Sequence, residues 1–259
     1  MISARIPTAP ERSGDGAVRL KRFASRVPLG AAAAVDIAAA LRKVLARPGP
    51  ARMVFASAPS QAETLAALAC APRIDWSRVH AFHMDEYIGL ASDAPQRFGN
   101  WLHQHFLSRV PVGAAHLIEP GPDPRAAAAQ YAARLAEAPI DIVCLGIGVN
   151  GHIAFNDPPV ADFEDPLAVK IVTLDAVCRQ QQVDEACFAR LEDVPMRAIT
   201  LTVPRLLDAA HLFCMVPGAI KRTAVAAALH GPISTECPAS ALRRHPDCTL
   251  YVDAESAPA

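Results

Sequence analysis

The chain has 259 residues, of which 52% are hydrophobic and 20% are charged, a composition typical of a compact globular protein with one or two domains. Its formal net charge of −1 gives no electrostatic basis for binding nucleic acid or an anionic membrane, so we expect neither as a partner. The seven cysteines include no Cys-x-x-Cys pair, and their odd number does not suit a secreted disulfide framework, so we expect a cytoplasmic protein.

Along the chain, short β-branched runs alternate with segments rich in alanine and leucine. This pattern predicts an α/β fold with a doubly wound, mostly parallel sheet and helices on both faces. We expect a flexible tail over residues 1–16 and a single domain over 17–259, because no Gly/Ser-rich linker divides the chain. The predicted strands lie near residues 18–22, 52–56, 78–84, 140–145, 168–174, 198–203, 212–216 and 248–252. The predicted helices lie near residues 31–46, 61–69, 98–108, 124–138, 177–191, 219–229 and 239–244.

The second predicted strand is followed by a helix start that carries Ser57, Ser60 and Gln61. Free amides at a helix start can hold an anion, so these residues are candidates for substrate binding. The alternative is structural, because Ser60 and Glu63 have the spacing of a capping box, which would satisfy the helix end internally.

The third predicted strand runs directly into Asp85, Glu86 and Tyr87. A carboxylate held rigidly at a strand end can act as a general base on a substrate carbon. Acidic pairs after strands are also common in turns, so this pattern alone does not establish a site.

The strand at 140–145 leads into Gly146, Gly148 and Gly151, which match a dinucleotide-binding fingerprint. The tandem prolines at 158–159 prevent the helix that this fingerprint requires, so we expect no nicotinamide or flavin cofactor. His152 follows the glycines, with Asp157 close enough to orient it, and histidine can carry protons near neutral pH. The histidine pairs elsewhere in the chain lack a third ligand, so we expect no metal.

After the strand at 212–216, the chain places Gly218 and Lys221 at a helix start. A lysine in the first turn opposes the helix dipole, which indicates an anionic ligand. Together with the serines after the second strand, Lys221 could hold a phosphate.

Two long motifs, Phe82-x-Met-Asp-Glu-Tyr-x-Gly-Leu90 and Gly146-x-Gly-x-Asn-Gly-His-Ile-Ala-Phe-Asn-Asp-Pro158, stand in this order in the chain. With them, the sequence strongly resembles the glucosamine-6-phosphate deaminase (isomerase) family over most of its length. The resemblance implies the doubly wound α/β fold and the conversion of glucosamine 6-phosphate and water into fructose 6-phosphate and ammonia. This reaction belongs to amino-sugar (N-acetylglucosamine) catabolism and uses no metal or organic cofactor. Members are often oligomeric, so the resemblance also suggests a homo-oligomer.

The resemblance further implies roles for single residues. Asp85 would move the proton from C2 to C1, and His152 would assist opening of the sugar ring. Asn150 and Asp157 would complete the catalytic group, and Lys221 would bind phosphate. The implied substrate-side residues are those of the helix start and of the motifs: Ser57, Ser60, Gln61, Glu86, Tyr87, Gly148, Gly151, Arg179 and Lys221.

The chain departs from the family pattern at several of these positions. Asn150 stands where many members have aspartate, and Asp157 where they have glutamate. Ala58 to Gln61 replace a Gly-Gly-Thr phosphate loop, and Asp184 stands near the place of a phosphate-binding arginine. Reaction type is therefore better supported than substrate identity. The alternatives are a hydrolase like the 6-phosphogluconolactonases, which share the fold, and a sugar-phosphate-binding sensor without catalysis.

Overall fold

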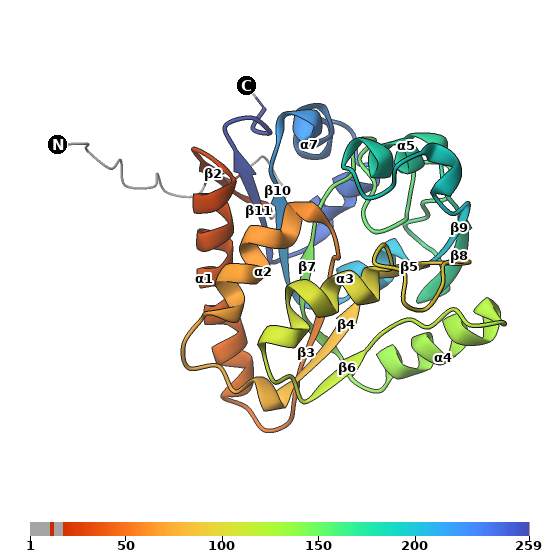
Figure 1. Cartoon of the computed structure of the whole chain (residues 1–259). Helices are drawn as coiled ribbons and strands as arrows, with labels where there is room; N and C mark the ends of the chain where they lie inside the picture. Colours follow the sequence, from red (N-terminus) through yellow and green to blue (C-terminus); the bar gives the residue numbers. More distant parts are fainter. Residues whose placement is uncertain (1–10, 13–17, 259) are drawn as a thin grey trace.

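The structure, a computed structural model, describes residues 11–12 and 18–258 and contains two β-sheets (Figure 1). The large sheet has eight strands in the order β1-β2-β11-β10-β7-β3-β4-β6, and only the β1–β2 pair is antiparallel. Its strands are β1 (Glu11–Arg12), β2 (Val18–Phe23), β3 (Ala51–Phe55), β4 (Val79–His83), β6 (Ala114–His116), β7 (Ile140–Leu145), β10 (Ala209–Val216) and β11 (Cys248–Asp253). The second sheet has the order β5-β9-β8 and is antiparallel. Its strands are β5 (Asp85–Tyr87), β8 (Val169–Thr173) and β9 (Arg197–Leu201).

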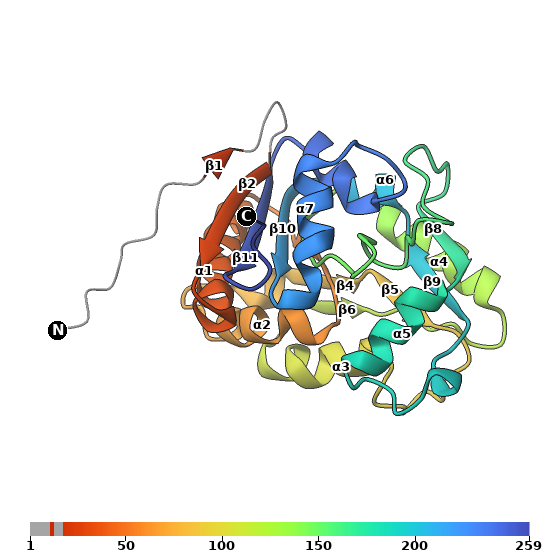
Figure 2. The same ribbon diagram turned by 90° about the horizontal axis from the view of Figure 1, so that it is seen from above.

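Helices cover both faces of the large sheet, as the sequence predicted (Figure 2). On one face lie α1 (Arg26–Leu45), α2 (Ala62–Ala69) and α3 (Phe98–His105). The other face packs against α4 (Pro124–Ala136), α6 (Val203–Leu207) and α7 (Arg222–His230). The remaining helix, α5 (Ala176–Asp184), packs with the aromatic cluster beside the small sheet. The doubly wound α/β architecture is confirmed.

The central strands form where the sequence is mostly apolar, with Arg52 and Asp141 as the charged residues of β3 and β7. Every residue of β3 and β7 is buried. A parallel sheet covered by helices on both faces requires such strands, because neither face meets water. The run of apolar residues at 140–145 therefore predicted β7 to the residue.

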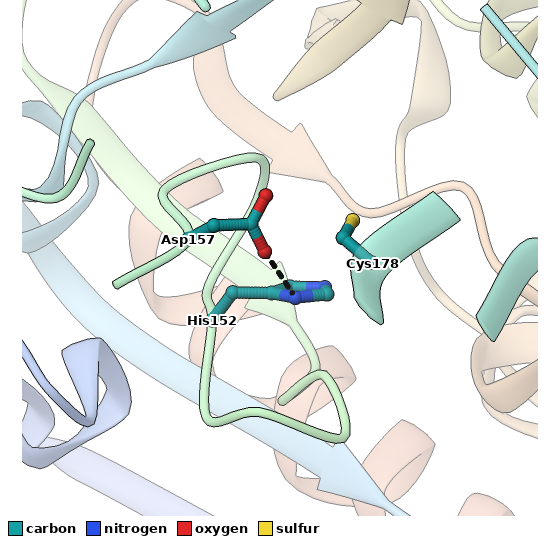
Figure 3. A group of neighbouring side chains, drawn as sticks. All are labelled: His152, Asp157 and Cys178. Carbon is teal, nitrogen blue, oxygen red and sulfur yellow. Dashed lines mark ion pairs between the residues drawn. The ribbon is translucent and has the colours of Figure 1, made fainter. Parts of the chain in front are cut away.

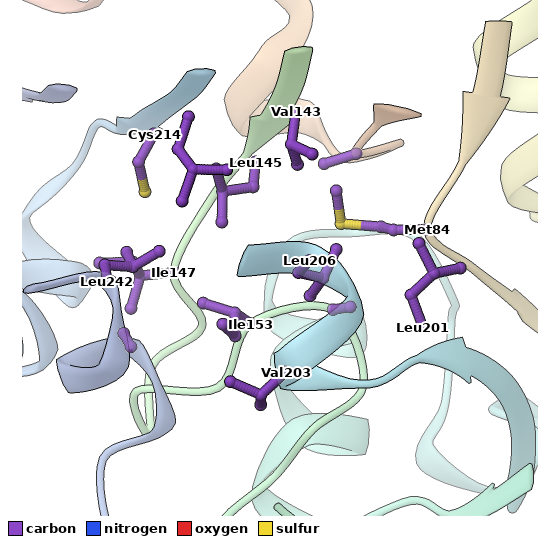
Figure 4. Close-up of a cluster of buried hydrophobic side chains, with 14 of the residues drawn as sticks. Met84, Val143, Leu145, Ile147, Ile153, Leu201, Val203, Leu206, Cys214 and Leu242 are labelled. Atoms are coloured by element: carbon purple, nitrogen blue, oxygen red, sulfur yellow. The ribbon is translucent and has the colours of Figure 1, made fainter. Parts of the chain in front are cut away.

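The small sheet corrects the prediction of one continuous sheet. The predicted strands at 168–174 and 198–203 form as β8 and β9, but they pair with β5 instead of joining the large sheet. The predicted strand at 78–84 ends at His83, and after Met84 the chain enters β5, where Asp85 lies opposite Thr200. The reason is packing, because Met84 and Leu201 fill the space between the two sheets (Figure 4).

Other boundaries also differ. The helix predicted at 177–191 ends at Asp184, because Ala186 adopts a left-handed backbone with φ 58°. The segment predicted as a helix at 239–244 is a 3₁₀ helix, Pro238–Arg244, and β6 and α6 were not predicted. Most of the predicted tail at 1–16 lies outside the described residues, whereas Glu11–Arg12 form β1. Among the described residues, no helix is both long and apolar enough to cross a membrane.

Candidate active site

A cavity with about 550 Å³ of space lies where β3, β4, β7 and β10 end, at their carboxyl edge. In an open α/β sheet this edge is the usual place for a ligand. Several predicted site residues line the cavity together: Ser57, Ser60, Gln61, Asp85, Gly148, His152 and Lys221.

Asp85 lies at the junction between the two sheets and is 7% exposed. Burial raises the pKa of this carboxyl well above its ordinary value, and the neighbouring charge of Glu86 raises it further. Its side chain makes no hydrogen bond with the rest of the described chain, so a substrate in the cavity would not have to displace a partner.

His152 lies on the loop after β7, and its ring packs flat against Gly148. A Cβ atom at position 148 would lie 2.1 Å from Cε1 of the imidazole, so only glycine leaves room for the ring. The Gly148 amide donates to the His152 carbonyl at 2.9 Å, and Gly151, with φ 84°, allows the loop to turn between them. Gly148 and Gly151, which match the dinucleotide-binding fingerprint by spacing, therefore serve to place the histidine.

Asn150 and Asp157 orient the imidazole. Nδ1 of His152 lies 2.7 Å from Oδ1 of Asn150 and 2.9 Å from Oδ1 of Asp157. Because both neighbours are oxygen acceptors, Nδ1 carries the proton and Nε2 is the nitrogen free to accept one. Asn150 also donates to Asp157 at 3.0 Å. Burial alone would raise the pKa of Asp157, but the hydrogen bonds from His152 and Asn150 outweigh it and lower this pKa.

Cys178 of α5 completes this group, and Figure 3 shows its thiol beside His152 and Asp157. The possible ligand atoms of the three side chains lie within 4.8 Å of one another, and all three residues are buried. Burial raises the pKa of the Cys178 thiol well above its ordinary value, and the charges of Asp157 and Asp85 raise it further. A metal would need the thiolate, whereas burial and the nearby carboxylates favour the protonated thiol. The geometry is therefore that of a hydrogen-bonded network around the imidazole.

Lys221 also lines the cavity and is 4% exposed. Its Nζ lies 3.0 Å from Oε1 of Glu185, a residue that the sequence did not single out. The Gln181 amide donates to the same oxygen at 2.8 Å and accepts from the Val149 amide at 2.9 Å. The cavity thus carries an ion pair at the place predicted for phosphate.

The capping-box alternative for Ser60 is wrong. No side chain caps α2 or the 3₁₀ turn before it, because Glu63 instead forms an ion pair with Arg26 at 3.0 Å. Ser60 accepts a hydrogen bond from Gln61 at 3.1 Å, and Oγ of Ser57 is buried without a partner. These polar atoms are available to a ligand.

Other predicted substrate-side residues lie outside the cavity. The buried carboxylate of Glu86 accepts from the amides of Tyr87, Phe98 and Gly99, so it caps α3. Arg179 donates to two backbone carbonyls, those of Leu191 and Val194.

Two further residues of the predicted set also lie outside the cavity. Tyr87 faces a smaller neighbouring cavity of about 450 Å³. Gly151 packs against Cys237.

One face of the site, formed by residues of α5 and by Glu185 after it, was not predicted from the sequence. Cys178, Gln181, Gln182 and Glu185 follow the spacing i, i+3, i+4, i+7, which places them on one side of a helix. The last three line the cavity. Two glutamines and a glutamate at this spacing, on the same side of a helix as Cys178, are the signal that could have found them.

The fold and cavity thus define an α/β protein in which a buried carboxyl and an oriented imidazole line a cavity at the carboxyl edge of parallel strands. The model of the family described as glucosamine-6-phosphate isomerases/6-phosphogluconolactonase matches residues 24–251. The chain belongs to this family, as its motifs predicted.

Relatives within the family are named deaminases. Glucosamine-6-phosphate deaminase of Listeria innocua is 34% identical over 199 residues, which are 76% of this chain and 83% of the relative. The protein of the same name from Streptococcus sanguinis is 33% identical over 184 residues, 71% of this chain and 76% of the relative.

Solved structures agree with the fold. A structure described as a monomeric glucosamine-6-phosphate deaminase matches with a TM-score of 0.83 at 26% identity, covering 92% of this chain and 98% of that one. A 6-phosphogluconolactonase from Thermotoga maritima matches with a TM-score of 0.74 at 18% identity, covering 91% and 99%. The second likeness shows the shared fold alone.

Proposed function

We propose that this protein is a glucosamine-6-phosphate deaminase, which isomerises and deaminates glucosamine 6-phosphate to fructose 6-phosphate and ammonia. The observation that carries the proposal is the placement of a buried carboxyl, Asp85, and an oriented imidazole, His152, in one cavity. The relatives named deaminases support the same reading.

In the proposed reaction His152 acts first. Its Nε2 takes the proton of the anomeric hydroxyl and passes it to the ring oxygen, so the bond between C1 and the ring oxygen breaks and the aldehyde forms. Asp157 and Asn150 hold the imidazole in the tautomer that this step needs.

Asp85 then removes the proton from C2, which the neighbouring aldehyde makes acidic. The resulting enolamine takes the proton back at C1, and the C2 carbon becomes an iminium group. Addition of water at C2 releases ammonia and leaves the ketose, so the sum is sugar phosphate plus water to ketose phosphate plus ammonia. Each positioned acid or base of this kind contributes about 10²–10⁴-fold to the rate.

We place the phosphate beside Lys221, at the part of the cavity formed by the segments after β3 and β10. Lys221, Ser60, Gln61 and the uncapped amides of the 3₁₀ turn lie there, and they offer positive charge and hydrogen-bond donors. Anchoring the sugar through its phosphate would hold C2 against Asp85.

The assay is direct. Purified protein with glucosamine 6-phosphate should release ammonia and fructose 6-phosphate in equal amounts. If neither glucosamine 6-phosphate nor galactosamine 6-phosphate released ammonia, the proposal would be refuted. Rapid hydrolysis of 6-phosphogluconolactone would favour the lactonase, and thermal stabilisation by sugar phosphates without turnover would favour the sensor.

The proposal extends to the setting of the enzyme. The seven cysteines are all free, which is consistent with a cytoplasmic enzyme. The homo-oligomer suggested by the family stays a prediction, and one structural neighbour is described as monomeric.

A further inference from the structure

The cation placed for a phosphate is already paired with a carboxylate of the same chain. Nζ of Lys221 lies 3.0 Å from Oε1 of Glu185, and the two side chains are only 5% and 15% exposed. Gln181 donates to the same carboxylate oxygen at 2.8 Å and fixes its position. The pair is therefore shielded from solvent and held from two sides.

The charges along the cavity show how this ion pair affects the binding of a phosphate. Among the described residues that line it, Lys221 is the single lysine or arginine, whereas Asp85 and Glu185 both carry carboxyls. A phosphate dianion beside Lys221 would meet the charge of Glu185 at close range, where little water screens it.

We propose that Glu185 is a specificity-determining residue, which occupies Lys221 in place of a substrate phosphate and sets the affinity of the cavity for phosphorylated sugars. This inference rests on the proposed function, since it assumes that Lys221 receives the phosphate. A phosphate binds only by exchanging with Glu185.

The exchange weakens the binding of free phosphate and of a complete substrate alike, but only the substrate has further contacts to offset the cost. When inorganic phosphate binds, it forms an ion pair with Lys221, but the ion pair between Lys221 and Glu185 is lost. It makes few other contacts. A sugar phosphate also gains contacts along the cavity towards Asp85 and His152, which offset that cost. The pair thus keeps the site from being filled by inorganic phosphate.

The position of Glu185 allows the exchange. It follows the last residue of α5, Asp184, and precedes Ala186, whose left-handed backbone ends the helix. Within the described chain, only Lys221 and Gln181 make hydrogen bonds or ion pairs with its carboxylate. The side chain can therefore leave Lys221 without unfolding the helix.

The test is the variant Glu185→Gln, which keeps the shape of the side chain and removes its charge. Inorganic phosphate is titrated into the full-length protein by calorimetry. The dissociation constant should fall about tenfold, as expected from removing one negative charge beside a dianion. Glu192→Gln is the matched control, because it makes the same change at a side chain that is 67% exposed and lies outside the cavity, and its dissociation constant should equal that of the wild type.

Steady-state kinetics give a second readout. With glucosamine 6-phosphate, Glu185→Gln should lower KM by more than it changes kcat, and inorganic phosphate should become a stronger competitive inhibitor. Lys221→Gln should abolish phosphate binding in both backgrounds. If Glu185→Gln does not fold, Glu185→Ala takes its place in both measurements.

Two outcomes would overturn the inference. Unchanged phosphate affinity in Glu185→Gln would show that Glu185 does not compete, and weaker affinity would show that it positions Lys221 instead. The calorimetry needs no turnover. Tighter phosphate binding without any deamination would therefore count against the proposed function alone.

Discussion

At the residue scale, the carboxyl that orients His152 and the carboxyl proposed as the base are held in opposite ways. Asp157 is fixed by hydrogen bonds that lower its pKa, so it stays ionised beside His152. Asp85 is buried without such partners, and its pKa is raised. Environments that separate the pKa values of nearby acids are typical of sites where each acid has its own task.

The variant Asp85→Asn should lose activity without losing stability. We expect turnover of glucosamine 6-phosphate to fall about 10³-fold, because the amide cannot take the C2 proton. The free energy of unfolding at pH 7 should be no lower than in the wild type, because the amide avoids the cost of a buried charge. Ammonia release and urea denaturation measure the two effects. Asp93→Asn, at an exposed position, should change neither.

The raised pKa of Asp85 also predicts how this difference depends on pH. Its carboxyl ionises more readily in the unfolded chain than in the folded protein. The wild type therefore loses stability as the pH rises from the unfolded pKa, about 3.9, through the higher folded pKa. Asp85→Asn lacks this loss, so the advantage of the variant should grow with pH over that window. Urea denaturation of both proteins from pH 4 to pH 8 measures it, and a difference that shrinks with pH would contradict the assignment.

At the element scale, the loop after β7 fixes the position of His152. The ring lies against the bare backbone of Gly148, and Asn156 of the same loop donates to the Leu201 carbonyl of β9 at 2.8 Å. The loop is thus tied to both sheets, and its glycines are needed for close packing instead of for a dinucleotide.

Gly148→Ala tests this role of the loop. The new methyl group would overlap the imidazole, so we expect His152 to be displaced and kcat to fall about 10²-fold, the scale of one lost acid–base group. The matched control is Gly99→Ala, where an added Cβ meets no atom closer than 3.4 Å. Steady-state kinetics compare the two. Full activity in Gly148→Ala would mean that the ring position does not matter for turnover.

Residues with a local signal were predictable, and those with a purely tertiary role were not. The strand end at Leu145 was predicted to the residue and the one at His83 to within one residue, so Asp85 and His152 could be placed beside one edge from the sequence. The sequence could not show that Glu86 turns inward to cap α3, because that depends on how the chain folds back from residue 86 to residue 98. The pairing of Glu185 with Lys221 likewise joins two distant segments, and no local pattern encodes it.

At the scale of the whole molecule, the two sheets share one interior. Leu201 of the small sheet and Val143 and Leu145 of the large sheet belong to the same buried cluster, and Met84 lies between them (Figure 4). Because Asp85 follows Met84 directly, the junction that joins the sheets also positions the proposed base. Loss of packing there should affect the whole chain and not the small sheet alone.

Leu201→Ala tests this coupling. Leu201 is fully buried, so its truncation should lower the free energy of unfolding by about 2–5 kcal/mol. Unfolding should remain a single transition. The fluorescence of Trp76 and Trp101 reports on the core of the large sheet, where both tryptophans lie. This fluorescence and the far-ultraviolet circular dichroism should therefore change at the same urea concentration. Met196→Ala is the control, because this side chain is 62% exposed and precedes β9, so its loss should cost little. If the circular dichroism of Leu201→Ala fell before the fluorescence changed, the small sheet would be unfolding as a separate unit.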